Sequence, residues 1–229
     1  MKTLSLVIPV YNAPDLARAA VTHVPELAAA ATSCGFRLVE TILVDDGSNL
    51  PLEENLSAAE CPCRVLRQPV NRGKGAAVRR GALEAKGGWV LMSDVDLSAP
   101  LTEFSRLAPH ADAWMVCGSR YGRSGMPFRR RILSRIFHLL VWLAGVRGVR
   151  DTQCGFKLFR MDVMRSVFEA QRTERFAFDV ELVRRVCRAG GTLVEVPVSW
   201  HGGRRSSLRV MRDAPRMLWD IAMICRNGD

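Results

Sequence analysis

The 229-residue sequence contains no apolar run of the roughly 18 to 20 residues that a helix needs to cross a bilayer. The nearest candidate, residues 132–146, is interrupted by polar residues that include Arg135 and His138, so we expect a buried or interfacial helix there. A secretory signal is also lacking, because Met1 and Lys2 lead straight into a strand pattern. These absences predict a cytoplasmic protein that touches a membrane only from its surface.

Motifs that define several common enzyme classes are missing as well. The glycine-rich loop from Asn71 to Gly75 is not a P-loop, and it fails the dinucleotide-binding G-x-G-x-x-G pattern because Val78 holds the last position. The G-x-S-x-G motif of α/β-hydrolases does not occur. The four histidines and seven cysteines show no spacing typical of a metal site or a redox pair, and we interpret the cysteines as reduced thiols.

The charge of the chain has a strong positive bias. There are 33 lysines and arginines against 23 acidic residues, a net charge of +10, while 48% of the residues are apolar and suffice for a real core. A positive field favours anionic partners such as nucleotides, phospholipid surfaces, phosphorylated substrates or nucleic acid. Aromatic residues make up only 7% and do not alternate with basic ones in the way that stacks bases, so we expect no nucleic-acid partner.

Strand and helix patterns alternate along the chain. The patterns predict strands over 4–10, 39–44, 64–68, 89–93, 113–117 and 192–200, and helices over 16–31, 52–59, 76–86, 178–189 and 208–225. Such alternation predicts an α/β fold with a doubly wound, mostly parallel sheet flanked by helices. With no repeat or low-complexity segment, we expect one domain over residues 1–229.

Acidic residues follow two of the predicted strands, at the sheet edge where α/β proteins bind ligands. Asp45 and Asp46 are adjacent, so only one of them can face a ligand, and we expect the other to cap the turn at Gly47. Asp94 and Asp96 are two residues apart, which in a strand places both side chains on one face. Two converging carboxylates repel each other unless a cation lies between them, and their hard oxygen atoms favour Mg²⁺ or Mn²⁺. The same D-x-D spacing also occurs in plain loops.

Basic residues form two further candidate sites. The loop from Asn71 to Gly75 is either a phosphate cradle at a helix N-terminus or only a tight strand–helix turn. Arg120 and the run 129–131 concentrate positive charge beside the apolar segment 132–146. Such a run is often just a solvated face. Its functional interpretation is a site for an anionic head group whose apolar tail lies along Ile136.

Taken together, these segments resemble the inverting family 2 glycosyltransferases, in particular the polyprenyl-phosphate branch that includes dolichyl-phosphate β-glucosyltransferase and dolichyl-phosphate mannose synthase. The shorter matching blocks are Val7 to Asn12, Val44 to Ser48, Asn71 to Ala77, Asp94 to Asp96 and Gly118 to Arg120. The more specific blocks are Arg150 to Phe159 and Arg175 to Leu182, which look more like the glucosyl branch. The resemblance implies a GT-A-type, Rossmann-like nucleotide-sugar fold.

The resemblance also implies roles for individual residues. The donor would be bound by Pro9, Tyr11, Asn12, Asp45, Asp46, Lys74, Asp94, Val95, Asp96 and Arg205. The acceptor phosphate would be bound by Arg120, Arg130 and Ser134. Catalysis would depend on Asp94, Asp96, Arg120 and Arg130, with Asp94 and Asp96 holding Mg²⁺ or Mn²⁺. The chain departs from the family at Ala13, where Glu is usual, and at Ser207, where Lys is usual, so Arg205 or Arg209 would supply that charge.

The implied reaction is inverting transfer of a hexose from a nucleotide sugar to a polyprenyl or dolichyl phosphate, with UDP-glucose as the favoured donor. GDP-mannose as donor and a soluble acceptor are the alternatives. Residues 1–118 would form the nucleotide-sugar-binding half, and residues 119–229 the acceptor-binding half with interfacial helices. The protein would sit peripherally on the cytoplasmic face of the membrane, in contact with anionic lipid.

Overall fold

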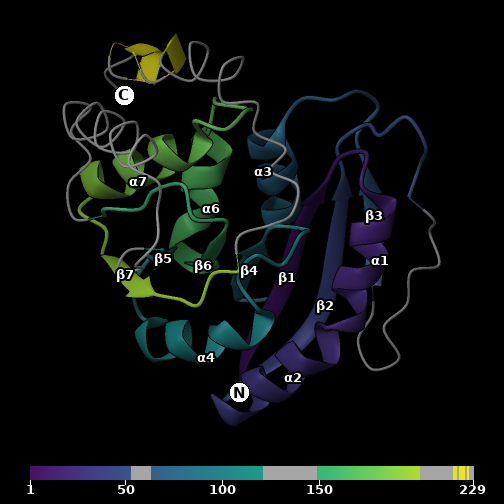
Figure 1. The fold of residues 1–229 in the computed structure, drawn as a ribbon. Coiled ribbons are helices and arrows are strands. Elements are labelled where there is room, and N and C mark those ends of the chain that lie inside the picture. Colours follow the sequence, from purple (N-terminus) through teal and green to yellow (C-terminus); the bar gives the residue numbers. More distant parts are fainter. Residues whose placement is uncertain (53–62, 121–148, 202–218, 221, 225, 227–229) are drawn as a thin grey trace.

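The computed structural model describes residues 1–52, 63–120, 149–201, 219–220, 222–224 and 226 (Figure 1). Several predicted features lie outside these residues: the helix over 52–59 except for its first residue, the apolar helix over 132–146 and most of the helix over 208–225. The same is true of the predicted site residues Arg130, Ser134 and Arg205. Among the described residues, no helix is long and apolar enough to span a membrane.

The described strands form a seven-stranded sheet in the order β3-β2-β1-β4-β6-β5-β7. The strands are β1 (Lys2–Val10), β2 (Phe36–Asp45), β3 (Cys63–Arg67), β4 (Trp89–Ser93), β5 (Met115–Ser119), β6 (Phe156–Arg160) and β7 (Leu193–Pro197). Neighbouring strands are parallel except where β6 pairs antiparallel with β4 and with β5. The predicted mostly parallel sheet is confirmed.

Helices cover both faces of this sheet (Figure 1). They are α1 (Pro14–Thr22), α2 (Val24–Ser33), α3 (Lys74–Glu84), α4 (Phe104–Leu107), α6 (Met161–Ala170) and α7 (Phe178–Arg188), with short 3₁₀ turns at Leu101–Glu103 and Ala108–His110. Successive residues of β1 point to opposite faces. Leu6 and Ile8 belong to the apolar layer under α1, α2 and α4, whereas Val7 belongs to the layer under α3, α6 and α7. This two-sided cover confirms the doubly wound arrangement.

The single helix predicted over 16–31 is wrong, because the chain forms two helices that meet at His23. His23 ends α1 and begins α2, with φ −93° and ψ −1°. Pro25 explains the break: inside a continuous helix it lacks an N–H donor, and its ring would clash with the carbonyl of Val21. In the first turn of α2 that missing donor costs nothing.

The sequence patterns predict no element over 156–170, yet β6 and α6 occupy this segment. β6 lies between β4 and β5, where Leu158 is paired with Leu91 on one side and Val116 on the other. Phe156, Leu158 and Phe159 are almost fully buried. The strand therefore belongs to the centre of the sheet and joins the two halves of the chain.

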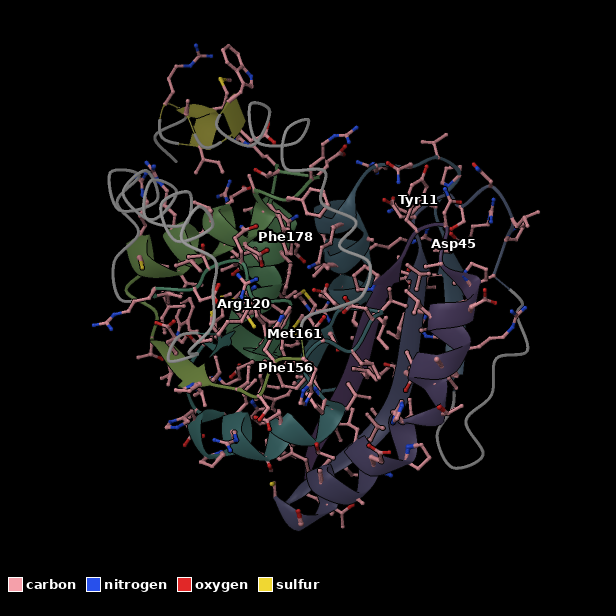
Figure 2. The ribbon with its side chains drawn as sticks, viewed as in Figure 1. Tyr11, Asp45, Arg120, Phe156, Met161 and Phe178 are labelled. Carbon is pink, nitrogen blue, oxygen red and sulfur yellow. The ribbon has the colours of Figure 1, made fainter. Side chains whose placement is uncertain are left out.

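The strand directions place the predicted site residues at one edge. β1, β2, β3 and β4 are mutually parallel, and β5 runs in the same direction because both β4 and β5 are antiparallel to β6. The residues that follow these strands, Tyr11, Asp46, Asp94 and Arg120 among them, therefore share the carboxyl edge of the sheet. Figure 2 shows Tyr11 beside Asp45 at the upper right and Arg120 nearer the centre.

Candidate active site

The loops that follow β1 and β2 are tied to each other by hydrogen bonds. Asn12, with a left-handed φ of 49°, donates its backbone N–H to Ser48 Oγ at 2.9 Å. Its side-chain oxygen Oδ1 accepts the backbone N–H of Asn49, also at 2.9 Å. Tyr11 is 49% exposed beside this double link, and Pro9 is buried in β1. The arrangement presents an aromatic ring at the sheet edge, the type of group on which a nucleobase stacks.

Asp45 caps the turn after β2, as predicted for one of the two adjacent acids. Its Oδ1 accepts the backbone N–H of Ser48 at 2.9 Å, and its Oδ2 accepts Arg67 Nη1 at 2.7 Å. The side chain is fully buried. Asp45 therefore holds the turn together, and its assignment to donor binding remains a prediction.

Asp46 uses both carboxylate oxygens to organise the loop before α3. Oδ1 accepts the amide of Gln68 at 2.8 Å and the backbone N–H of Arg72 at 2.9 Å. Oδ2 accepts Asn71 Nδ2 at 2.9 Å and the backbone N–H of Gly73 at 2.8 Å. Burial raises the pKa of this carboxyl, although the two backbone donors lower it. The anion bound by these two amides is thus Asp46 itself, and the phosphate-cradle hypothesis for the rest of the loop remains a prediction.

A segment from the second half of the chain, residues 171–177, packs across the N-terminus of α3. Ala76 donates its backbone N–H to the carbonyl of Glu174 at 2.9 Å, and Gln171 Nε2 donates to the carbonyl of Gly75 at 3.0 Å. A Cβ on Gly75 would lie 2.6 Å from Cβ of Phe178, so only glycine permits this approach. The N-terminal ends of α3 and α7 are therefore in direct contact.

This packing brings Arg175, to which the sequence assigned no role, next to the donor half. Its side chain lies against Gly73, where a Cβ would be 2.9 Å from Cγ of Arg175, and its charge lowers the pKa of Asp46. The signal in the sequence was the block from Arg175 to Leu182, but a block shared with a family does not by itself say what each residue contacts.

Asp94 follows the end of β4 and is held from two sides. Its Oδ1 lies 2.6 Å from Nζ of Lys74, the first residue of α3. Its backbone N–H donates to the carbonyl of Gly155 at 3.0 Å, and its carboxylate lies so close to that residue that any Cβ there would overlap it. The structure thus brings Lys74 and Asp94 together, as the predicted donor site requires.

The residues after Asp94 form a turn, so the expectation that strand alternation aligns Asp94 and Asp96 is wrong. β4 ends at Ser93, and Leu97, with a φ of 46°, donates its N–H back to the carbonyl of Asp94 at 3.1 Å. Asp96 Oδ1 accepts the backbone N–H of Ser98 at 3.0 Å. The two carboxylates are therefore positioned by a tight turn and not by the pleat of a strand.

The oxygen atoms on this turn fit a hard divalent cation. Asp94 and Asp96 are both partly exposed, and the buried hydroxyl of Ser98 has no hydrogen-bond partner among the described residues. The described part of the chain contains no cluster of three or more acidic, histidine or cysteine side chains that could hold a metal. This donor set suits Mg²⁺, which proteins often bind through one or two carboxylates with substrate phosphates and water completing the shell.

Arg120, directly after β5, forms a bidentate ion pair with Asp151. Its Nε and Nη2 each lie 2.7 Å from an oxygen of Asp151, and its backbone N–H donates to the same carboxylate at 2.9 Å. The guanidinium also lies over the ring of Trp200, 5.2 Å from the centroid. Burial alone would lower the pKa of Arg120, but the hydrogen bonds and charge of Asp151 outweigh it and raise the pKa. Arg120 is thus fixed at the sheet edge, and its role at the acceptor phosphate remains a prediction.

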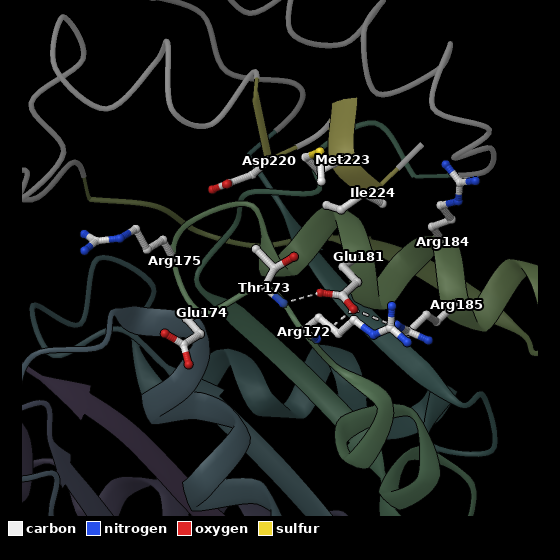
Figure 3. A pocket seen from close by; sticks show the side chains of 10 residues that line it. All are labelled: Arg172, Thr173, Glu174, Arg175, Glu181, Arg184, Arg185, Asp220, Met223 and Ile224. Atoms are coloured by element: carbon white, nitrogen blue, oxygen red, sulfur yellow. Dashed lines mark hydrogen bonds and ion pairs between the residues drawn. The ribbon is translucent and has the colours of Figure 1, made fainter. Parts of the chain in front are cut away.

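A pocket lies beside this edge, between the 171–177 segment, α7 and the C-terminal helical residues (Figure 3). Glu181 organises its floor by accepting the backbone N–H groups of Arg172 and Thr173 and the side chain of Arg185. Arg175 and Arg184 point in opposite directions from it in Figure 3. The pocket lining is Arg172, Thr173, Glu174, Arg175, Glu181, Arg184, Arg185, Asp220, Met223 and Ile224. None of these residues belongs to the predicted site.

Comparison with known proteins identifies the family. Residues 5–168 match the family described as Glycosyl transferase family 2. A dolichyl-phosphate β-glucosyltransferase of Dictyostelium discoideum is 31% identical over 242 residues, covering 96% of this chain and 73% of that protein. The human dolichyl-phosphate β-glucosyltransferase is 31% identical over 224 residues, covering 87% and 67%. A third, from Trichomonas vaginalis, is 36% identical over 186 residues, and this chain spans only 55% of its length.

Solved structures agree on the fold. Glucosyl-3-phosphoglycerate synthase from Mycobacterium tuberculosis, in complex with Mn²⁺, uridine diphosphate and glucosyl-3-phosphoglycerate, superposes with a TM-score of 0.74 at 17% identity, covering 99% of this chain and 79% of that one. Mannosyl-3-phosphoglycerate synthase from Rubrobacter xylanophilus gives 0.69 at 19% identity, covering 99% and 73%. The predicted GT-A fold is confirmed. With this fold, the carboxyl-edge site and the family match over residues 5–168, the chain belongs to glycosyl transferase family 2 and is a glycosyltransferase.

Proposed function

We propose that the protein transfers a hexose from a nucleotide sugar, with UDP-glucose as the favoured donor, to a polyprenyl or dolichyl phosphate, and that the product is β-linked. The observation that carries the proposal is the identity of the relatives: dolichyl-phosphate β-glucosyltransferases that match up to 96% of the chain at 30% to 36% identity. The matches span 55% to 73% of the length of these relatives.

The donor would lie along the ends of β1, β2 and β4. Tyr11 offers a ring to the base, and Lys74 offers an ammonium group to the diphosphate. Asp94 and Asp96 would hold Mg²⁺ or Mn²⁺, which when bound neutralises charge on the leaving diphosphate. The turn at 94–97 and the contact with Gly155 fix Asp94 before the donor arrives, so little reorganisation is needed.

The acceptor phosphate would attack from the β5 side of the edge. A phosphate monoester has a second pKa of about 6, so its oxygen is anionic at neutral pH and needs no dedicated base. That oxygen forms a bond to the anomeric carbon as the bond from this carbon to the diphosphate oxygen breaks, which inverts the configuration. Arg120, fixed by Asp151, would orient the acceptor together with Arg130 and Ser134, which lie outside the described residues.

The direct test is synthesis of a lipid-linked sugar. The protein is incubated with Mn²⁺ or Mg²⁺, a polyprenyl phosphate and either UDP-glucose or GDP-mannose, and the lipid product is analysed by mass spectrometry. We expect a glucosylated lipid phosphate from UDP-glucose. Product from GDP-mannose alone would change the donor assignment, and donor binding without any lipid product would overturn the acceptor assignment in favour of a soluble acceptor.

Asp96→Ala tests whether Asp96 helps to hold the divalent cation. Because this carboxylate is one of only two assigned to the cation, we expect loss of metal-dependent donor turnover with an unchanged thermal melting temperature. Asp112→Ala is the matched control, since Asp112 is an exposed acid whose side chain pairs with Lys2. Turnover retained by Asp96→Ala would remove Asp96 from the cation site.

Arg130→Ala tests the acceptor site separately. Loss of a guanidinium that binds the acceptor phosphate should raise the acceptor KM more than the donor KM. Steady-state kinetics with each substrate varied in turn measure the two constants, and the reverse pattern would assign Arg130 to the donor instead.

A further inference from the structure

Two lysine–aspartate pairs meet where α3 and α7 touch. Lys74 at the start of α3 pairs with Asp94 at 2.6 Å, and Lys157 on β6 pairs with Asp179 on α7, also at 2.6 Å. Gly75, next to Lys74, packs directly on Phe178, which precedes Asp179. The first pair belongs to the proposed cation site, whereas the second has no role in the reaction described above.

The Lys157–Asp179 pair is buried almost completely. The side chains of Lys157 and Asp179 are 0% and 3% exposed. Taking two charges out of water is costly, and replacement of such a pair by neutral residues is often harmless to stability, so burial alone does not explain why a pair would be kept here. Its position offers a reason: Lys157 also donates to the carbonyl of Cys154, the residue before the Gly155 that contacts Asp94.

Asp179 interacts electrostatically with both members of the other pair. Burial raises the pKa of the Asp179 carboxyl, Lys157 and Lys74 lower it, and Asp94 raises it further. The four side chains thus gather two positive and two negative charges around the contact between Gly75 and Phe178. Of the two carboxylates, only that of Asp94 is partly exposed at the sheet edge, with a side chain 30% accessible.

Binding of a divalent cation to Asp94 has a consequence for Lys74. The ammonium group lies 2.6 Å from Asp94 Oδ1, so it would compete with a cation for this carboxylate. The Lys74 side chain is only 18% exposed, and a displaced ammonium in this setting needs another anion. We propose that Asp179, held in place by Lys157, is the positioning residue that receives Lys74 when a divalent cation takes Asp94 before the donor diphosphate is bound. This inference rests on the proposed function, because it requires the cation site.

Cation affinity distinguishes the proposed role of the Lys157–Asp179 pair from a purely structural role. A structural pair would change the stability of the fold and leave cation affinity unaltered. A pair that receives Lys74 would change cation affinity even in a variant whose stability is normal, because Lys74 would then remain on Asp94. Residues that orient metal ligands from behind typically change metal affinity by about 10- to 100-fold when they are replaced.

The experiment measures Mn²⁺ binding to the full chain without nucleotide, by electron paramagnetic resonance of free Mn²⁺. Lys157→Met combined with Asp179→Asn removes both buried charges at similar volume, which avoids the unpaired charge that either single change would leave. We expect its Mn²⁺ affinity to fall about 10-fold or more with a wild-type melting temperature. Lys2→Met combined with Asp112→Asn is the matched control, an exposed pair of the same residue types.

Lys74→Met gives the second arm of the test, which does not depend on a core substitution. Because the competing ammonium is gone, we expect Lys74→Met alone to bind Mn²⁺ more tightly than wild type. Added to the Lys157→Met/Asp179→Asn variant, it should restore affinity to the level of Lys74→Met alone. A folded core variant with wild-type Mn²⁺ affinity, or a Lys74→Met variant with unchanged or weaker affinity, would overturn the inference. Wild-type protein that binds no Mn²⁺ even with UDP would instead overturn the cation part of the proposed function, and this inference with it.

Discussion

Gly155 positions Asp94 by having no side chain. The Asp94 carboxylate lies against its Cα, and the Gly155 carbonyl accepts the Asp94 backbone N–H at 3.0 Å. The strand β6 begins immediately afterwards, so the backbone at Gly155 has little freedom to move away. A methyl group at this position would therefore push the Asp94 carboxylate from its place between Gly155 and Lys74.

Gly155→Ala should consequently reduce kcat/KM for the donor by about 10²-fold, the scale of effect expected when a reacting group is displaced by about 1 Å. Gly88→Ala is the control, because a Cβ there meets nothing closer than Thr3 Oγ1 at 3.6 Å and its φ is not left-handed. Steady-state donor turnover measures the effect, with circular dichroism to check the fold. Equal activity of both variants would show that Asp94 does not depend on this contact.

At the scale of single residues, the sequence predicted local roles well and distant partners poorly. The cap formed by Asp45 is confirmed because its partner Ser48 lies three residues away. The hydrogen bonds of Asp46 reach to residues 68–73, and the strand argument for Asp94 and Asp96 failed because β4 ends at Ser93, before either residue. The partners of Asp151 and Asp179 come from other elements, and no local pattern specifies them.

Asp151 joins the end of β5 to the middle of β7. Its carboxylate binds the backbone and side chain of Arg120, and its own backbone N–H donates to Glu195 of β7 at 3.0 Å. Burial alone would raise the pKa of Asp151, but the hydrogen bonds and charge of Arg120 outweigh it and lower the pKa. The pKa of Asp151 in the folded protein is therefore lower than its pKa in the unfolded chain, which is about 3.9. The charged carboxyl stabilises the fold at pH values above about 3.9, and this contribution is lost as the pH falls through the folded pKa.

Asp151→Asn should therefore lower the free energy of unfolding at pH 7 by about 2 kcal/mol, a value kept modest because Arg120 is 35% exposed and solvent screens the pair. The difference from wild type should shrink as the pH falls below about 4 and toward the lowered folded pKa, where the wild-type carboxyl also loses its charge. Urea unfolding at a series of pH values gives both quantities. A difference that stays constant over this range would mean that the charge of Asp151 contributes nothing.

At the scale of elements, the predicted strands of the first half are confirmed because most of them are short apolar runs ended by a turn. No turn separates β6 from α6, because the helix begins at Met161 directly after the strand ends at Arg160. The antiparallel place of β6 between β4 and β5 also depends on pairing over distances of about 40 to 70 residues along the chain, which periodicity does not encode. The break at His23 was, by contrast, predictable from Pro25.

The whole molecule combines a sheet edge built from both halves with a large positive charge. β4 and β6 pair within one sheet, so Asp94, which follows β4, contacts Gly155 from the second half. The net charge is +10, and the predicted lipid acceptor lies in a surface that is anionic in many membranes. Electrostatic attraction of this kind acts over the Debye length, about 10 Å at 0.1 M salt and about 3 Å at 1 M.

We therefore expect the protein to sediment with vesicles that contain phosphatidylserine at low salt, and to be released as the salt concentration approaches 1 M. Neutral phosphatidylcholine vesicles are the control, because they offer no surface charge. Cosedimentation at several salt concentrations, with the bound fraction measured by gel densitometry, tests this directly. Binding that is equal on both vesicles and insensitive to salt would assign membrane contact to apolar insertion, whereas absence of binding to either would favour a soluble acceptor, since a lipid phosphate can reach the Arg120 side of the edge only from a membrane surface.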